Sequence, residues 1–209
     1  MSERGEYMKL QFTIAMFSLA LLAGNAAAGT VTVNFTTLPG NTAGGYYVGN
    51  TGATVNGVAT PLMCDDFSTE TSVPSGPFQY NVTTLANLAT AKFTGLVNYE
   101  AAAVLLWEFE NGGQQDPGAY NFALWDIFDP AAGSYGDSVV RLAGARAVVA
   151  GGGFSLAYDE LQIFTAIPSG SNQEFLGEDS PTPVPEPGSM LLMGGGLLLL
   201  GASRWLRGR

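Results

Sequence analysis

The sequence contains no histidine, and this absence removes several common kinds of site. A Ser–His–Asp triad uses histidine as its general base, and most catalytic zinc sites use histidine ligands. The chain also has a single cysteine, so it has no intramolecular disulfide framework. Hydrolases of the triad type and His-ligated metal centres are therefore excluded before any motif is considered.

Charged residues, and basic ones above all, are also scarce. They make up 12% of the chain, against about 25% in an average soluble domain. Only Lys92, Arg141 and Arg146 are basic between residues 10 and 203, and the formal net charge of the chain is −10. An acidic segment of this kind repels nucleic acid and anionic membranes. We expect no nucleic-acid partner.

The N-terminal segment has the composition of a secretory signal peptide. Lys9 precedes an apolar stretch at residues 12–23, and small residues follow as far as Ala28. The stretch is shorter than the roughly 20 residues of a membrane-spanning helix, and its order is that of a charged region, an apolar region and a cleavage site. We predict that residues 1–28 are a signal peptide, cleaved by signal peptidase between Ala28 and Gly29.

The C-terminal segment combines a proline-rich strip with a short apolar run. The strip SPTPVPEPG cannot continue a helix or a central strand. The following residues, 188–206, are just long enough to span a membrane. By the positive-inside rule, arginines at the end would stay in the cytoplasm and leave the preceding residues outside. We expect residues 178–187 to be a linker and residues 188–209 to be a transmembrane helix with membrane-retaining charges. These charges are Arg204, Arg207 and Arg209.

The order of Val184-Pro185-Glu186-Pro187, an apolar helix and terminal arginines resembles the PEP-CTERM sorting signal of exported bacterial proteins, also catalogued as the ice-binding protein C-terminal domain. The resemblance implies that an exosortase, a membrane protease, recognises Pro185, Glu186 and Pro187 and removes the tail. It also implies export across the inner membrane, transient anchoring, and then a place on the surface or in the matrix of a biofilm-forming bacterium that makes exopolysaccharide.

Residues 29–177 are predicted to form an extracellular α+β domain. The run TVTVNF alternates with period two, as strands do, and Asn56-Gly57 suits a two-residue hairpin turn, whereas LPGNTAGG is expected to be a turn. Helical segments follow, and LQIFTAIP and NQEFLG have the composition of final strands. Because strands and helices do not alternate, we expect antiparallel strands flanking a central group of about three helices.

The three predicted helices have recognisable ends. The first ends at Asn111, before two glycines. The second begins with Asp116 as its cap and Pro117 at its first position, and it ends before Pro130. The third runs over residues 137–149 with Asp137 as its cap. The apolar face of the first helix is predicted to consist of Leu96, Tyr99, Ala103, Leu106 and Trp107. That of the second is predicted to consist of Phe122, Leu124, Trp125 and Phe128.

Cys64 follows a predicted strand, and two interpretations of it stay open. A free cysteine between Met63 and Phe67 can be a small buried hydrophobe. The order of elements around it, with the run Asn121-Phe122-Ala123-Leu124-Trp125, is similar to the thioester domains of bacterial surface adhesins. That resemblance implies a cross-link between Cys64 and the residue at position 121, which then couples to amines on a target surface. Asn121 stands where those domains have glutamine, and its side chain is one methylene shorter.

Other polar and aromatic residues could have a chemical role, but a structural or solvated role is also possible for each of them. Lys92, the lysine that remains after signal cleavage, could form an isopeptide bond beside a buried acid, but we expect a solvated lysine at a helix start. Three acidic groups could offer Ca²⁺ ligands without having the spacing of a dedicated loop; they are Asp65-Asp66, Asp126 with Asp129, and Glu178-Asp179. We expect no metal and no cofactor. Four aromatic residues could bind sugar rings or simply pack in the core: Tyr46, Tyr47, Trp107 and Trp125.

The sequence therefore predicts an exported surface or matrix protein with a binding or structural role rather than an enzyme. A self-cross-linking adhesin domain is one alternative. An exported carbohydrate-active enzyme with a pair of carboxylates is another, because the distance between such groups is spatial and not sequential.

Overall fold

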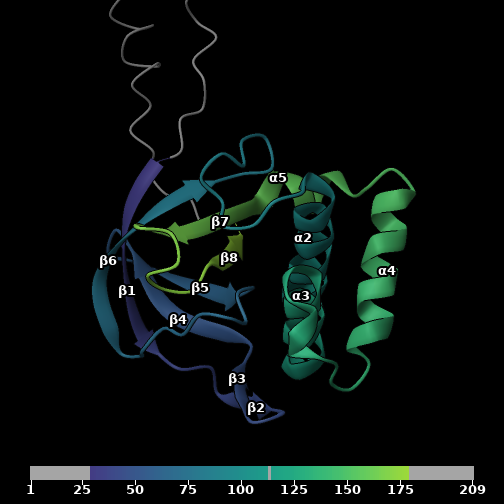
Figure 1. The fold of residues 1–209 in the computed structure, drawn as a ribbon, viewed down its shortest axis with the longest axis horizontal. Helices are drawn as coiled ribbons and strands as arrows, with labels where there is room; N and C mark the ends of the chain where they lie inside the picture. Colours follow the sequence, from purple (N-terminus) through teal and green to yellow (C-terminus); the bar gives the residue numbers. More distant parts are fainter. Residues whose placement is uncertain (1–28, 113, 179–209) are drawn as a thin grey trace, which may run out of the picture. The chain divides into compact units, whose positions relative to one another are not determined.

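Six antiparallel strands close into a barrel in the computed structural model, which describes residues 29–112 and 114–178 (Figure 1). The predicted signal peptide and transmembrane helix, the PEP residues and the terminal arginines lie outside the described residues. Within the described ranges, every helix is too short or too polar to span a bilayer.

The barrel strands neighbour one another in an order that differs from the chain order. Around the barrel they are β1 (Gly29–Thr37), β4 (Asn50–Val55), β5 (Val58–Cys64), β8 (Phe175–Glu178), β7 (Leu161–Ala166) and β6 (Ser75–Thr83), and β6 pairs with β1. A small closed barrel fills its interior with side chains. The interior cluster includes Val33, Phe35, Leu62, Tyr80, Phe164 and Phe175, all at most 2% exposed.

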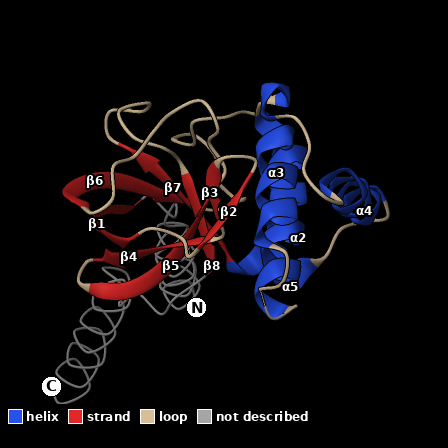
Figure 2. Ribbon diagram, turned by 90° about the horizontal axis from the view of Figure 1, so that it is seen from below, coloured by secondary structure: helices blue, strands red, loops and turns tan. Residues whose placement is uncertain are grey.

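Antiparallel α+β architecture is confirmed, but the strands do not flank the helices in space. β7 and β8 follow the helices in the chain and still complete the barrel, with Cys64 opposite Phe175 and Tyr80 opposite Ala166. The helices lie together beside the barrel rather than between strands (Figures 1 and 2). The prediction of a central helical group is therefore wrong in three dimensions, because pairing between distant strands offsets the cost of closing the long helical connection.

Two hairpins precede the helices. Asn56 and Gly57 both have positive φ, 49° and 85°, and connect β4 to β5 as the predicted two-residue turn. A shorter hairpin joins β2 (Asn41–Ala43) to β3 (Tyr46–Val48) outside the barrel. Part of LPGNTAGG is thus a strand and not only a turn. This hairpin contacts helix α3 (Pro117–Phe128).

The described part of the chain has four α-helices, one more than expected. They are α2 (Leu96–Asn111), α3 (Pro117–Phe128), α4 (Ser138–Ala150) and α5 (Ser155–Glu160), with a 3₁₀ turn η1 at Pro130–Ala132. α2 and α3 contact each other and the barrel strands, and α4 covers their outer side (Figure 2). α2 is buried on nearly all sides, but Leu96, expected on its buried face, is 48% exposed at the first turn.

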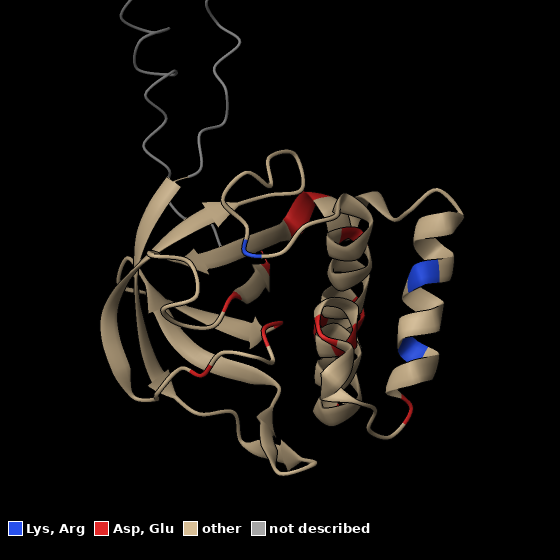
Figure 3. Cartoon of the chain, viewed as in Figure 1, with Lys and Arg blue, Asp and Glu red and all other residues tan. Residues whose placement is uncertain are grey.

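The helix ends match the predictions in one case and differ in another. Asp116 caps α3, and its carboxylate accepts the Ala119 N–H at 3.3 Å. Asp137 precedes α4 but makes no capping bond, because its carboxylate accepts the Arg141 Nε–H at 2.9 Å instead. Arg141 and Arg146 lie on α4, while the third basic residue of the described chain, Lys92, lies in the loop before α2 (Figure 3).

Candidate functional site

A cavity of about 490 Å³ opens where the hairpin β2–β3, the loop after β5 and helix α3 meet. Its floor includes Cys64 at the end of β5 and Asn121 of α3. Residues 69–73 and Gln173 form polar and mixed parts of its wall. Of the residues that line it, Glu70 is the one with a charged side chain.

Aromatic rings form one wall of this cavity. Tyr46 lies edge-on to Phe67 and Trp125, with ring centroids 5.1 Å and 5.8 Å away, and Phe67 lies 5.4 Å from Trp125. Tyr46 and its neighbour Tyr47 are 46% and 55% exposed, although β3 places them in a strand. The indole N–H of Trp125 is buried at this wall, beside the Cys64 thiol.

The fourth predicted sugar-binding aromatic, Trp107, belongs elsewhere. It lies on α2 and packs edge-on against Phe154 with a centroid distance of 4.6 Å. It does not line the cavity. The core interpretation therefore holds for Trp107, whereas Tyr46, Tyr47 and Trp125 share the cavity.

The structure brings Cys64 and Asn121 together through backbone contacts. The Asn121 amide donates to the Cys64 carbonyl oxygen at 2.9 Å, and its own carbonyl accepts the Gly49 N–H at 2.5 Å. The Cys64 thiol instead contacts the backbone of Asp66, with its Sγ 3.3 Å from the carbonyl oxygen. The predicted cross-link between Cys64 and Asn121 stays a prediction.

The Cys64 thiol is in an environment that suppresses its reactivity. Burial raises its pKa strongly, and the nearby Asp65 carboxyl acts in the same direction. The Asp66 backbone and the Trp125 side chain oppose this shift but do not cancel it. Because the thiolate is the nucleophile, the protonated thiol is a poor one.

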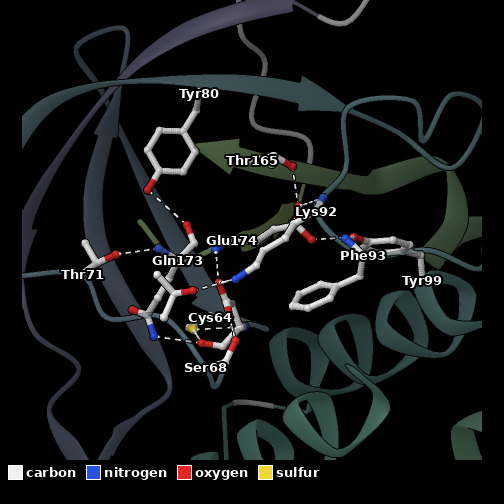
Figure 4. A network of polar contacts seen from close by, with 12 residues as sticks. Cys64, Ser68, Thr71, Tyr80, Lys92, Phe93, Tyr99, Thr165, Gln173 and Glu174 are labelled. Carbon is white, nitrogen blue, oxygen red and sulfur yellow. Dashed lines mark hydrogen bonds and ion pairs between the residues drawn. The ribbon is translucent and has the colours of Figure 1, made fainter. Parts of the chain in front are cut away.

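A network of polar groups, which shares Cys64, Thr71 and Gln173 with the cavity lining, is drawn in Figure 4. Lys92 Nζ contacts Asp66 Oδ2 at 2.5 Å and Thr69 Oγ1 at 2.6 Å. The Asp66 side chain is fully buried, and that of Lys92 is 18% exposed. The prediction of a solvated lysine at a helix start is therefore wrong, since the chain before α2 turns Lys92 toward the barrel.

Glu174, at the entry to β8, is the centre of this network. Its carboxylate accepts hydrogen bonds from the Tyr99 hydroxyl at 2.5 Å, from the Lys92 backbone N–H at 2.7 Å and from the Thr165 hydroxyl. Burial raises its pKa, and the three donors offset part of that effect. Its backbone N–H donates to Asp66 Oδ2 at 3.3 Å.

Asp65 is a further buried acid, next to Asp66 in the chain. It is 0% exposed, and neither of its carboxyl oxygens has a hydrogen-bond partner. Burial raises its pKa well above the ordinary value, and Glu174 and Asp66 add to the shift. The neutral acid is the form that such a site favours.

The other predicted acidic sites have ordinary structural surroundings. Asp129 caps η1 by accepting the Ala131 N–H at 3.0 Å. Glu178 lies near Glu110 and Glu160, and Asp179 lies outside the described residues. Over residues 29–112 and 114–178, no three Asp, Glu or Cys side chains are placed to hold a metal ion.

Sequence reasoning found Cys64, Asn121, Tyr46 and Trp125 but missed Glu174 and the pairing of Lys92 with Asp66. These groups are far apart in the chain, and an acid inside NQEFLG gives no sign that it is buried.

Comparison with known proteins gives one match to a family model and one to a solved structure. No curated protein matches the chain by sequence. Among solved structures, the chain is weakly similar to the N-terminal thioester domain of a surface protein from Clostridium perfringens. The identity is 14% and the TM-score 0.41, over 72% of this chain and 99% of that chain. The family model of the PEP-CTERM protein-sorting motif matches residues 183–207, which confirms the prediction made from Pro185, Glu186 and Pro187. The chain thus carries a PEP-CTERM sorting motif, which supports export and sorting by an exosortase.

Proposed function

We propose that this protein is exported, freed from its tail by an exosortase, and retained at the cell surface or in the extracellular matrix as a non-enzymatic binding module. The observation that carries the proposal is the sorting motif at residues 183–207. A sorting motif determines the location of a protein, and the cavity of the folded domain is a candidate binding site for a ligand.

The sorting step has a direct test in the producing cells. With Pro185, Glu186 and Pro187 intact, the mature protein is expected to lack Arg209 and to be recovered outside the inner membrane. Replacement of all three by alanine is expected to leave a chain that keeps Arg209 and fractionates with the membrane. Mass spectrometry of the C-terminal peptide distinguishes the two forms. A wild-type protein that retains Arg209 would contradict the proposal.

The ligand that suits the cavity is a segment of neutral polysaccharide. The volume of the cavity is about 490 Å³. Small-ligand sites occupy about 300–1,000 Å³. Tyr46 and Tyr47 expose flat apolar faces with polar tips, which suit sugar rings. Hydroxyl and amide groups of Thr71, Ser72 and Gln173 add hydrogen-bonding partners. The net charge of −10 disfavours an anionic polymer.

A binding role is better supported than hydrolysis. Asp65 and Glu174 are the buried acids with raised pKa values, and neither is among the residues that line the cavity. A glycosidase needs its two carboxyl groups on either side of the bound sugar bond. We therefore retain the proposal of a non-enzymatic module.

Binding is tested with the neutral polysaccharide fraction of the producing bacterium and the mature protein. Tyr47→Ala is expected to weaken binding by about 2- to 12-fold, because one aromatic contact contributes about 0.5–1.5 kcal/mol. Val140→Ala, which removes a 69% exposed hydrophobic side chain from α4, is the control and is expected to bind as wild type does. Equal loss in both variants, or no wild-type binding to the polysaccharide, would overturn the ligand assignment and leave the sorting result untouched.

A further inference from the structure

The Lys92–Asp66 pair has the placement of two groups ready to condense. Lys92 Nζ lies 2.5 Å from Asp66 Oδ2, so the amine nitrogen is also close to the carboxyl carbon. Two groups whose reacting atoms are held about 3–3.5 Å apart react much faster than the same groups free in solution. We propose that Lys92 and Asp66 form an intramolecular isopeptide bond. This inference does not depend on the proposed ligand or on sorting.

Every reacting group is fixed by further contacts. Asp66 accepts the Ser68 hydroxyl at 3.1 Å on Oδ1 and the Glu174 backbone N–H at 3.3 Å on Oδ2. The Lys92 backbone N–H is bound to Glu174 Oε2 at 2.7 Å, which anchors the base of the lysine side chain beside the acid. Thr69 Oγ1 accepts a hydrogen bond from the Lys92 amine at 2.6 Å. These contacts hold the amine against a single carboxyl group.

The atoms and protons of the step balance without any co-reactant. The Lys92 ammonium gives one proton to the Asp66 carboxylate, and the neutral amine then attacks its Cγ. A C–N bond forms, and the nitrogen passes a second proton to the same carboxyl oxygen. The C–O bond then breaks, and that oxygen leaves as water. One ammonium and one carboxylate thus become one amide and one water.

Burial of charge favours the amide over a lasting ion pair. Three acidic side chains, Asp65, Asp66 and Glu174, lie at 0–1% exposure, and the Lys92 ammonium pairs with Asp66. A buried ion pair loses much of its attraction to the cost of desolvating both ions. Condensation removes both charges from the interior and gives a neutral group. It also ties the loop after β5 to the loop before α2, across 26 residues of the chain.

The bond is detected by mass spectrometry of the full chain expressed in its host and digested with chymotrypsin after unfolding. Cleavage after Phe67 and Phe93 releases the fragments that hold Asp66 and Lys92. The expected product is one branched peptide that contains both fragments and is lighter than their sum by one water. Recovery of the two fragments as separate linear peptides of unmodified mass would overturn the proposal.

Two variants separate the bond from a simple ion pair. Lys92→Arg keeps the positive charge but cannot form the amide, so it is expected to give linear peptides only. Asp66→Asn offers a carboxamide to the amine, so its branched peptide is expected to be lighter by one ammonia. A thioester between Cys64 and Asn121 would also release ammonia, but in the wild type, and it would join the fragment that ends at Phe67, which holds both Cys64 and Asp66, to the fragment with Asn121 instead of the one with Lys92. A branched peptide that persists in Lys92→Arg would place the cross-link elsewhere and contradict the assignment.

Discussion

Asn121 connects three separate parts of the site. It is 1% exposed, and its amide joins helix α3 to the Cys64 carbonyl at the end of β5 and to the Gly49 N–H between β3 and β4. A carboxamide can donate and accept at once, which a carboxylate or an aliphatic side chain cannot do. The residue that departs from the thioester pattern therefore has a structural use of its own.

Asn121→Ala is expected to destabilise the fold by about 2–4 kcal/mol, because it leaves a buried N–H and a buried carbonyl without partners at a cost of about 1–3 kcal/mol each. Urea denaturation followed by circular dichroism measures the change. The matched control is Asn111→Ala at the exposed end of α2, where the amide bonds only to the Trp107 carbonyl of its own helix. That control is expected to stay within about 0.5 kcal/mol of wild type; similar losses in both variants would refute the role assigned to Asn121.

Cys64 and Asn121 show how far contacts between residues can be predicted from the sequence. Resemblance to a motif placed Cys64 and Asn121 at one site, and they do line one cavity. Which atoms meet depends on the path of the backbone, and here the amide reaches the carbonyl of Cys64. The same limit explains Lys92, whose direction is set by a loop that has no periodic pattern.

At the scale of elements, α3 and the hairpin β2–β3 approach closely because residue 118 has no side chain. A Cβ atom at Gly118 would lie 2.8 Å from the Ala43 Cβ and 2.8 Å from the Tyr135 ring. Gly144 also lies within a helix, α4, but a Cβ there meets no atom within 4 Å. The two glycines thus form a matched pair that differs in packing.

Gly118→Ala is expected to cost about 1–3 kcal/mol through overpacking. Gly144→Ala is expected to add about 0.4–1 kcal/mol, because alanine restricts the unfolded chain and favours the helix. Thermal unfolding of both variants gives the comparison. If Gly118→Ala proved as stable as Gly144→Ala, the close approach of the hairpin to α3 would not exist in solution.

Elements with local signals were predictable, and the barrel was not. The Asp116-Pro117 start of α3 and the Asn56-Gly57 turn depend on neighbouring residues and are confirmed. Strand β6 was missed, although Phe78, Tyr80 and Val82 alternate, because its start, Ser-Gly-Pro, has the composition of a turn. Closure of the barrel depends on pairing β1 with β6 and β5 with β8, which are contacts between distant segments.

At the scale of the whole molecule, the acidic excess reaches into the interior. Burial raises the pKa values of Asp65 and Glu174, and burial with the charges of Glu110 and Glu160 raises the pKa of Glu178 from 4.5 to about 7. An acid whose pKa is higher in the folded state binds more protons there than in the unfolded state. Its contribution to stability is therefore present at low pH and is lost as the pH rises through the folded pKa.

The free energy of unfolding is accordingly expected to rise when the pH falls from about 8 to about 5, because Glu178 takes up its proton between its unfolded pKa of about 4.5 and its folded pKa of about 7. Glu178→Gln imitates the protonated acid, so it is expected to be more stable than wild type at pH 8 and to depend less on pH. Asp159→Asn removes one negative charge at an exposed position, so it corrects for net charge and is expected to keep the wild-type slope. Urea denaturation across this pH range measures all three proteins. A wild-type protein that loses stability on acidification to pH 5 would show that these carboxyl groups are ionised and well solvated in the folded state.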